Sequence, residues 1–385
     1  MEKVRIGIIG IGNMGSNHVQ RLEKGDVPEM VAAAVCDINP ERLEWAEKNY
    51  PDIPRFDDAE KMMDSGLVDA ILVAVPHYDH PRLSIMGMKK GLHVMCEKPA
   101  GVYTKQVKEM NEVSKQCNVK FGMMFNQRTN CLYRKLREIV QSGSYGEIRR
   151  TNWIINSWYR SQNYYDSGAW RATWSGEGGG VLLNQCPHQL DLWQWICGMP
   201  SKVYTKMHFG KWHDIEVEDD VTTYVEYPNG AVGAFTTTTG DAHGANRFEI
   251  TLDRARIVCE GTTIKIWEFE VPTSKHIKTA IGFAQPTILA EHIINCTGSN
   301  EQHNDVLKAF AAAILRDEPM TADGTEGING LTLSNAMHLS AWLNKDIEIA
   351  TFDDELYYNE LMKRVATSRR KTDVKATVND TSGTY

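Results

Sequence analysis

The chain has 385 residues, which is enough for two or three domains at about 150 residues each. Hydrophobic residues make up 42% and charged residues 24%, a balance that excludes a disordered or fibrous protein. Asp and Glu number 50 against 42 Lys and Arg, and the net charge of −8 argues against nucleic acid as a partner.

The sequence carries no signal for a membrane or for an oxidising compartment. No apolar run reaches the ~18 residues of a membrane helix. A strand pattern begins at Val4 without a leader pattern before it. The eight cysteines contain no CxxC pair, so we expect reduced, mostly buried thiols and no metal site. We therefore expect a cytoplasmic protein that does not bind membranes.

Apolar, β-rich segments alternate with helical segments in the first part of the chain. The expected strands are 4–9, 31–36, 69–75, 92–95 and 119–124. The expected helices are 16–24, 41–49, 81–90 and 104–117. This alternation predicts a parallel, doubly wound sheet, and we assign residues 1–125 to an α/β Rossmann domain that binds a dinucleotide.

The pattern changes at about residue 126. Strands are expected at 221–227, 231–238, 247–252 and 256–260, and helices at 303–316 and 330–344. We assign residues 126–365 to an α+β domain that binds substrate and has a large, mostly antiparallel, open sheet. The expected helices are too few to cover both sheet faces, which predicts a homodimer or homotetramer formed through that sheet. Residues 366–385 form a polar tail that we expect to be mobile or to pack on a neighbour.

The first expected strand leads into a GxGxxG motif at residues 10–15, and the motif opens a helix. Glycines in this context allow a tight turn, close approach of a pyrophosphate and packing of the helix on the sheet. A purely structural glycine turn is the alternative. We expect cofactor contacts from the motif residues Gly10, Gly12, Asn13, Met14 and Gly15.

Asp37 ends the second expected strand, where a carboxylate accepts hydrogen bonds from both ribose hydroxyls of a dinucleotide. Its negative charge would repel a 2′-phosphate, so the sequence favours NAD over NADP. Arg42 lies close to Asp37 in the sequence, which leaves open the use of both NAD and NADP. A helix cap is the alternative role for Asp37.

Lys98 follows another strand of the predicted sheet, within Glu97-Lys98-Pro99. Ligands bind beyond the carboxyl ends of parallel strands, so a lysine at this position faces cofactor and substrate. Elsewhere such a residue would be a solvated loop lysine.

Asn184, His188 and Asp191 have i, i+4 and i+7 spacing, which places them on one face of a helix that begins near Asn184. Pro187 requires the helix to begin close to it, and Gly198 provides the stop. A histidine there either points into a cleft or is a core histidine satisfied by Asp191, and the spacing leaves both open.

Taken together, these motifs resemble the glucose-fructose oxidoreductase, inositol dehydrogenase and rhizopine-catabolism (Gfo/Idh/MocA) family, from Val4 to about Lys363. The resemblance also rests on residues 75–80, on Asn126-Gln127-Arg128 and on the three glycines at 178–180. It implies that Lys98 and His188 act at a substrate hydroxyl. The cofactor contacts that it adds are Pro76, His77, His80, Glu97 and Lys98.

The chain departs from the family pattern at Asn184, where most relatives carry aspartate. Asn cannot take a proton but can hold a hydroxyl, so we assign proton transfer to His188 and Lys98, and orientation to Asn184 and Asp191. The substrate contacts expected from the resemblance are Lys98, Asn126, Arg128, Asn184 and His188.

An aromatic and arginine-rich segment, 158–171, precedes the glycines. Ring faces pack on sugar C–H surfaces while Arg and Tyr bind hydroxyls, so we expect Tyr164, Trp170 and Arg171 to contact a carbohydrate. The rest of the aromatic residues are attributed to core packing.

The sequence therefore predicts a NAD-dependent oxidoreductase acting on a secondary alcohol of a sugar, cyclitol or glycoside. The resemblance leaves open a glycosidase or glycoside-cleavage component that uses NAD transiently. A non-catalytic sugar sensor is disfavoured because both Lys98 and His188 are present.

Overall fold

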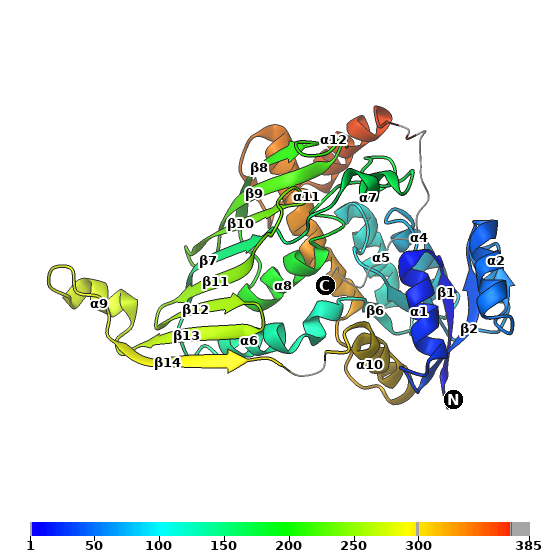
Figure 1. Cartoon of the computed structure of the whole chain (residues 1–385), viewed down its shortest axis with the longest axis horizontal. Helices are drawn as coiled ribbons and strands as arrows, with labels where there is room; N and C mark the ends of the chain where they lie inside the picture. The colour runs from blue at the N-terminus through cyan, green and yellow to red at the C-terminus, as the bar shows by residue number, and fades with distance from the viewer. Residues whose placement is uncertain (1, 298–299, 370, 372–385) are drawn as a thin grey trace.

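The computed structural model describes residues 2–297, 300–369 and 371. Figure 1 shows two sheets, one near the N-terminus and a larger one whose inner face is turned toward the first. Among the described residues, no helix is both long and apolar enough to cross a membrane. The predicted tail at 366–385 lies outside the described residues except for 366–369 and 371.

In the described part of the chain, six strands form the N-terminal sheet, in the order β3-β2-β1-β4-β5-β6. All of their pairings are parallel. The strands are β1 (Val4–Ile9), β2 (Met30–Cys36), β3 (Arg55–Phe56), β4 (Ala70–Val73), β5 (His93–Cys96) and β6 (Phe121–Met123). The order reverses between β1 and β4, where open α/β sheets hold their ligands. The predicted Rossmann domain is confirmed.

Helices connect these parallel strands. They are α1 (Asn13–Glu23), α2 (Pro40–Asn49), α3 (Ala59–Asp64), α4 (Asp79–Lys89) and α5 (Thr104–Gln116). The helix predicted from residue 16 begins at Asn13, directly after the glycine turn. This earlier start brings the free N–H groups of its first turn to the end of β1.

The core of the parallel sheet includes a helix from the C-terminal half of the chain. Val306, Leu307 and Phe310 of α10 (His303–Arg316) are buried in one apolar cluster with Ile6 and Ile8 of β1. The sequence-based division at residue 125 places α10 with the substrate domain, whereas its apolar face packs on the Rossmann sheet. Apolar periodicity predicted the helix but not the surface that it covers.

Nine of the described strands form the second sheet, in the order β14-β13-β12-β11-β7-β10-β9-β8-β15. The strands are β7 (Ile148–Ile155), β8 (Lys202–Phe209), β9 (Glu218–Glu226), β10 (Val232–Thr238), β11 (Asn246–Leu252), β12 (Ala255–Glu260), β13 (Thr263–Phe269), β14 (Ile288–Asn295) and β15 (Ile347–Glu348). Only the β7–β10 pair is parallel in this described sheet. The prediction of a large, mostly antiparallel sheet is confirmed.

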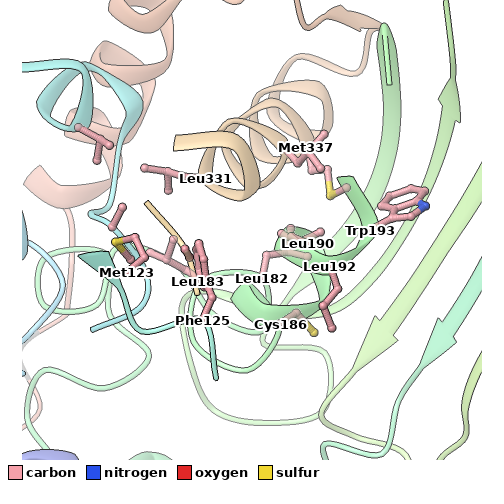
Figure 2. Close-up of a cluster of buried hydrophobic side chains, with 14 of the residues drawn as sticks. Met123, Phe125, Leu182, Leu183, Cys186, Leu190, Leu192, Trp193, Leu331 and Met337 are labelled. Carbon is pink, nitrogen blue, oxygen red and sulfur yellow. The ribbon is translucent and has the colours of Figure 1, made fainter. Parts of the chain in front are cut away.

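Helices α6, α8 and α11 lie on the face of this sheet that is turned toward the Rossmann domain (Figure 1). The helical segments of this half are η1 (Asn126–Thr129), α6 (Cys131–Gln141), α7 (Gln162–Asp166), α8 (Pro187–Cys197), α9 (Thr273–Thr279), η2 (Gly324–Glu326), α11 (Gly327–Leu343) and α12 (Asp354–Ala366). Figure 2 shows Leu190 and Leu192 of α8 near Met337 of α11. The apolar packing in Figure 2 fixes α8, whose first turn carries His188.

The opposite face of the sheet carries exposed apolar side chains. Trp153 and Ile155 of β7 are buried, whereas Ile154 between them is 45% exposed. On β9, Tyr224 is likewise 44% exposed. Strand side chains alternate between faces, so both exposed residues lie on the side away from α8.

Candidate active site

A cavity of about 660 Å³ lies beyond the carboxyl ends of β1, β4 and β5. Its walls come from the glycine turn and from β-strand ends on one side. Segments 158–171 and 184–188 of the second domain form the other side. The predicted residues that line it are Gly10, Gly12, Asn13, Met14, Asp37, Pro76, His77, His80, Glu97, Lys98, Tyr164, Trp170, Arg171, Asn184 and His188.

The three motif glycines have different physical roles. Gly10 has a φ of +84°, and a Cβ there would lie 2.6 Å from the carbonyl oxygen of Ala74. A Cβ on Gly15 would lie 1.8 Å from the carbonyl oxygen of Gly10, so this glycine packs α1 on β1 and does not line the cavity. A Cβ on Gly12 would meet no atom within 4 Å, although Gly12 lines the cavity. The space at Gly12 and the helix start at Asn13 fit a dinucleotide pyrophosphate.

Asp37 lines the same end of the cavity and is held by backbone N–H groups. Its carboxylate accepts from Ile11 at 2.8 Å and from Asn39 at 2.9 Å. Arg42 donates from Nε to the Ile11 carbonyl at 2.7 Å and does not line the cavity. Asn39, not Asp37, caps α2. The carboxylate therefore faces the cofactor end while the nearby guanidinium is engaged by the turn.

Three further acidic residues line this end, and the sequence did not identify them: Asp57, Asp58 and Glu60. They precede or begin α3, which follows the short edge strand β3. Their sequence signal was a run of acidic residues at a helix start, which is common at helix N-termini without any ligand. Their carboxylates add negative potential to the end of the cavity that Asp37 lines.

Lys98 follows β5, and its bond to Pro99 is cis. Its Nζ donates to the backbone carbonyl of Asn184 at 3.0 Å, which links the two domains at the cavity. Burial lowers the pKa of the Lys98 ammonium, and the negative charges of Glu97 and Glu177 offset part of that effect.

Glu97 lies behind Lys98 and contacts His18. Its Oε1 is 2.8 Å from Nε2 of His18, and its Oε2 accepts from the Lys98 backbone N–H at 3.2 Å. Burial acts to raise the pKa of Glu97, but the hydrogen bond and charge of His18 bring it down to about 2. The charged carboxylate fixes the backbone from which Lys98 projects.

His188 lies in the first turn of α8, after Pro187 at the helix start. Its side chain is buried, and its ring centre is 6.3 Å from that of Phe125. Burial, followed by the charge of Lys98, lowers the pKa of His188 well below its ordinary value. Burial therefore favours the neutral imidazole, the form of His188 that can act as a base.

Asn184 is not on the helix. The helix begins at Pro187, so Asn184 lies in the preceding turn, and its backbone N–H donates to Gly180 at 2.9 Å. Its side-chain Nδ2 donates to the buried carboxylate of Glu177. The helical spacing thus identified two cavity residues, Asn184 and His188, although only one of them is helical.

Asp191, Arg128 and Asn126 do not line the cavity. Asp191 accepts two hydrogen bonds of 2.7 Å from Arg128, and both side chains are 1% exposed. Asn126 donates to the side chain of Gln302 at 2.9 Å. The structure therefore does not bring Asn126, Arg128 or Asp191 to the cavity wall, where the expected substrate contacts and orienting role would require them. Instead, these side chains bind one another and the surrounding chain.

An aromatic wall lines the side of the cavity that the second domain forms. Arg171 donates from Nη1 to the Tyr164 hydroxyl at 2.9 Å. Its guanidinium lies 4.6 Å from the ring centre of Tyr164 and 4.7 Å from that of Trp170. Trp158 and Arg160 also line the cavity, although the sequence did not separate them from core residues.

A glycine-turn Rossmann sheet, with a second domain that places lysine and histidine at its ligand edge, defines a two-domain dinucleotide-binding oxidoreductase. Comparison with family models supports this class of protein. Residues 4–125 match the oxidoreductase family with an NAD-binding Rossmann fold, and residues 133–258 match the GFO/IDH/MocA C-terminal domain. The chain belongs to the Gfo/Idh/MocA family of NAD-binding oxidoreductases.

The chain is similar over much of its length to several dehydrogenases. Myo-inositol 2-dehydrogenase of Thermotoga maritima is 24% identical over 90% of this chain and 98% of its own length. D-glucoside 3-dehydrogenase of Escherichia coli is 26% identical over 60% of this chain and 68% of its own length. The structure of the WlbA dehydrogenase of Chromobacterium violaceum, solved with NADH and UDP-GlcNAcA, matches with a TM-score of 0.77 and 26% identity. The match covers 90% of this chain and 96% of the WlbA chain.

Proposed function

We propose that this protein oxidises a secondary alcohol of a sugar, cyclitol or glycoside with NAD. One observation carries the proposal: Lys98 and His188, from different domains, line one end of a cavity whose other end fits a dinucleotide. The names of the relatives, an inositol dehydrogenase and a glucoside dehydrogenase, support a polyhydroxylated substrate.

The glycine turn and Asp37 would hold the cofactor at the β1 and β2 strand ends. Bound NAD supplies a hydride acceptor, and the chain supplies the groups that bind and deprotonate the alcohol. The neutral imidazole of His188 accepts the hydroxyl proton as the C–H bond breaks. Lys98 Nζ donates to the same oxygen and stabilises the charge that develops there.

The aromatic wall would bind the rest of the substrate. Trp170 and Tyr164 offer ring faces to C–H surfaces, and Arg171 holds both rings in position. Arg and Tyr tips donate to hydroxyl groups. Selectivity among sugars would therefore come from this wall and not from the lysine and histidine.

The test is a panel of sugars, cyclitols and glycosides assayed for NADH absorbance. We expect at least one to reduce NAD, and we expect Lys98→Met and His188→Ala to lower the rate by about 10² to 10⁴. Both variants should bind NADH as the wild type does, because neither residue holds the glycine-turn end. An undiminished rate in His188→Ala would refute its role as proton acceptor. Cleavage of a glycoside without net formation of NADH would instead indicate transient use of NAD.

A further inference from the structure

Glu177 is a buried carboxylate directly behind the substrate end of the cavity. Its side chain is almost fully buried, and the residue does not line the cavity. One oxygen, Oε2, accepts from the backbone N–H of Ala172 at 2.5 Å. The other, Oε1, accepts from Nδ2 of Asn184. Its backbone carbonyl oxygen lies 3.3 Å from Nδ1 of His77, another cavity residue.

These contacts determine which way the Asn184 amide faces. A carboxylate only accepts hydrogen bonds, so the NH₂ group of Asn184 must face Glu177. The opposite side of the amide, Oδ1, is then directed away from Glu177. Because Asn184 lines the cavity, this leaves an acceptor for a substrate hydroxyl.

The two donors to Glu177 differ in freedom. Ala172 has a φ of 52°, in the left-handed region, and its carbonyl also accepts from the backbone of Glu216 at 3.4 Å. Its N–H direction is therefore set by the backbone. The Asn184 amide can rotate by half a turn about its last bond. Of the two donors, only the side-chain amide of Asn184 can reverse its orientation when residue 177 is substituted.

We propose that Glu177 is a positioning residue for the hydride-transfer reaction, which holds Asn184 with its oxygen toward the substrate and supplies the carboxylate charge that position 184 lacks. This inference rests on the proposed function. It explains how an asparagine serves at position 184, where the family resemblance implies an aspartate: the carboxylate charge lies one hydrogen bond further from the cavity.

The charge of Glu177 also acts on Lys98. Lys98 Nζ donates to the backbone carbonyl of Asn184 at 3.0 Å, so the lysine and Glu177 are connected through one residue. Glu177 raises the pKa of Lys98 against the effect of burial. Burial raises the pKa of Glu177 itself, and Arg171 is the main charge that opposes this. Other ionisable groups also interact with this pair: His77, His80, Glu97, Arg160, Tyr165, His188, Glu218, His303 and Lys371.

The substitution Glu177→Gln tests the orientation. The new amide must present its oxygen to the fixed N–H of Ala172, so its NH₂ group faces residue 184. Asn184 must then reverse and present Oδ1 to residue 177, which leaves NH₂ toward the substrate. We expect hydride transfer at saturating substrate to fall by about 10- to 100-fold from the lost acceptor.

The substitution Asn184→Asp, although it restores the residue that the family resemblance implies, places two carboxylates in contact and should also lower the rate. The double variant Glu177→Gln/Asn184→Asp removes this repulsion. In the double variant, the carboxylate at position 184 accepts from the amide at position 177 with one oxygen and offers the other oxygen to the substrate, with the total charge unchanged. We expect the double variant to recover to within about threefold of wild type, a coupling that independent structural damage would not produce.

A second readout does not depend on the substrate. Acetylation of Lys98 by acetic anhydride, followed by mass spectrometry across pH, reports the fraction of neutral amine. Loss of a nearby negative charge lowers an ammonium pKa, so Glu177→Gln should move the midpoint toward acid by about one pH unit. The double variant should move it back. Glu112→Gln, a distant exposed charge removal on α5, is the matched control and should change neither the rate nor the midpoint.

The outcomes separate the two hypotheses. If no carbohydrate of the panel reduces NAD with the wild type, the proposed function fails, while the Lys98 midpoints still test the charge of Glu177. If wild type is active but Glu177→Gln keeps its rate and midpoint, the role of Glu177 is refuted. If Glu177→Gln does not fold, the double variant decides: a folded and active double variant supports the proposal, and an inactive one overturns it.

Discussion

Replacing Arg128 by leucine should destabilise the protein without removing a substrate contact. Arg128 makes two hydrogen bonds of 2.7 Å to Asp191 and one of 2.8 Å to Glu326. The side chains of Arg128 and Asp191 are each 1% exposed, whereas that of Glu326 is 38% exposed. The substitution therefore leaves the Asp191 carboxylate buried without its cation, while Glu326 can turn to solvent.

The structure sets the size of this effect. Removing one partner of a fully buried ion pair costs about 3–5 kcal/mol, because the remaining charge stays desolvated. A domain of this size loses about 2–4 °C of melting temperature for each kcal/mol. The expected fall in Tm is thus about 6–20 °C. Substituting both partners, in Arg128→Leu/Asp191→Leu, should restore much of the loss because no buried charge remains.

Thermal unfolding followed by circular dichroism measures the stability, and NADH binding and KM are measured at a temperature where both variants are folded. We expect a lowered Tm for Arg128→Leu with unchanged NADH affinity and KM. A Tm within about 2 °C of wild type would refute the buried-pair argument. A raised KM at full stability would show that Arg128 contacts substrate, as the family resemblance implies.

Further predictions concern the cofactor, pH, substrate wall and assembly. NADP should bind more weakly than NAD, and Asp37→Ala should narrow the difference in a fluorescence titration; equal wild-type affinities would contradict this. Alcohol oxidation should fall as the pH rises through a midpoint below 10.5, the ordinary lysine pKa, because burial lowers the pKa of Lys98 and the neutral amine stabilises the developing negative charge less than the ammonium does; a midpoint that persists in Lys98→Met belongs to another group. Arg171→Ala should raise KM about tenfold with little change in kcat, because it frees Tyr164 and Trp170. Light scattering should show a dimer or tetramer, and a monomer of 43.5 kDa would contradict association through the open sheet face.

The parallel sheet was predictable because its strands are continuous apolar runs. The strand predicted at 4–9 matches β1 residue for residue. In contrast, β7 was missed because Arg149, Arg150 and Asn152 interrupt its apolar pattern. It lies at the centre of the second sheet, between β10 and β11, and buries only alternate side chains. Its pairings join segments about 80 or more residues apart, which local pattern does not specify.

The candidate site was predictable where chemistry follows a strand end. Gly12, Asp37 and Lys98 each come directly after an apolar strand, and all three line the cavity. The expected site residues that do not line the cavity have partners distant in the sequence. Arg128 is 63 residues from Asp191, and no spacing rule connects them. The sequence did not identify Glu177, because a charged residue before three glycines is usually exposed. Its burial and its contact with Asn184, which indicate a role at the site, are visible only in the structure.

The turn that carries Asn184 is fastened to the second sheet rather than to α8. Glu218, the first residue of β9, accepts from the backbone N–H groups of Gly180 at 2.8 Å and Leu182 at 3.0 Å. A Cβ on Gly180 would lie 2.0 Å from the Glu218 carbonyl oxygen, so only glycine allows this approach. Nε2 of His338 on α11 lies 2.9 Å from the same carboxylate. The distance from Lys98 to Asn184 therefore depends on how residues 180–182 bind β9. Helical spacing identified the right residues, but the position of Asn184 comes from this contact and not from a helix.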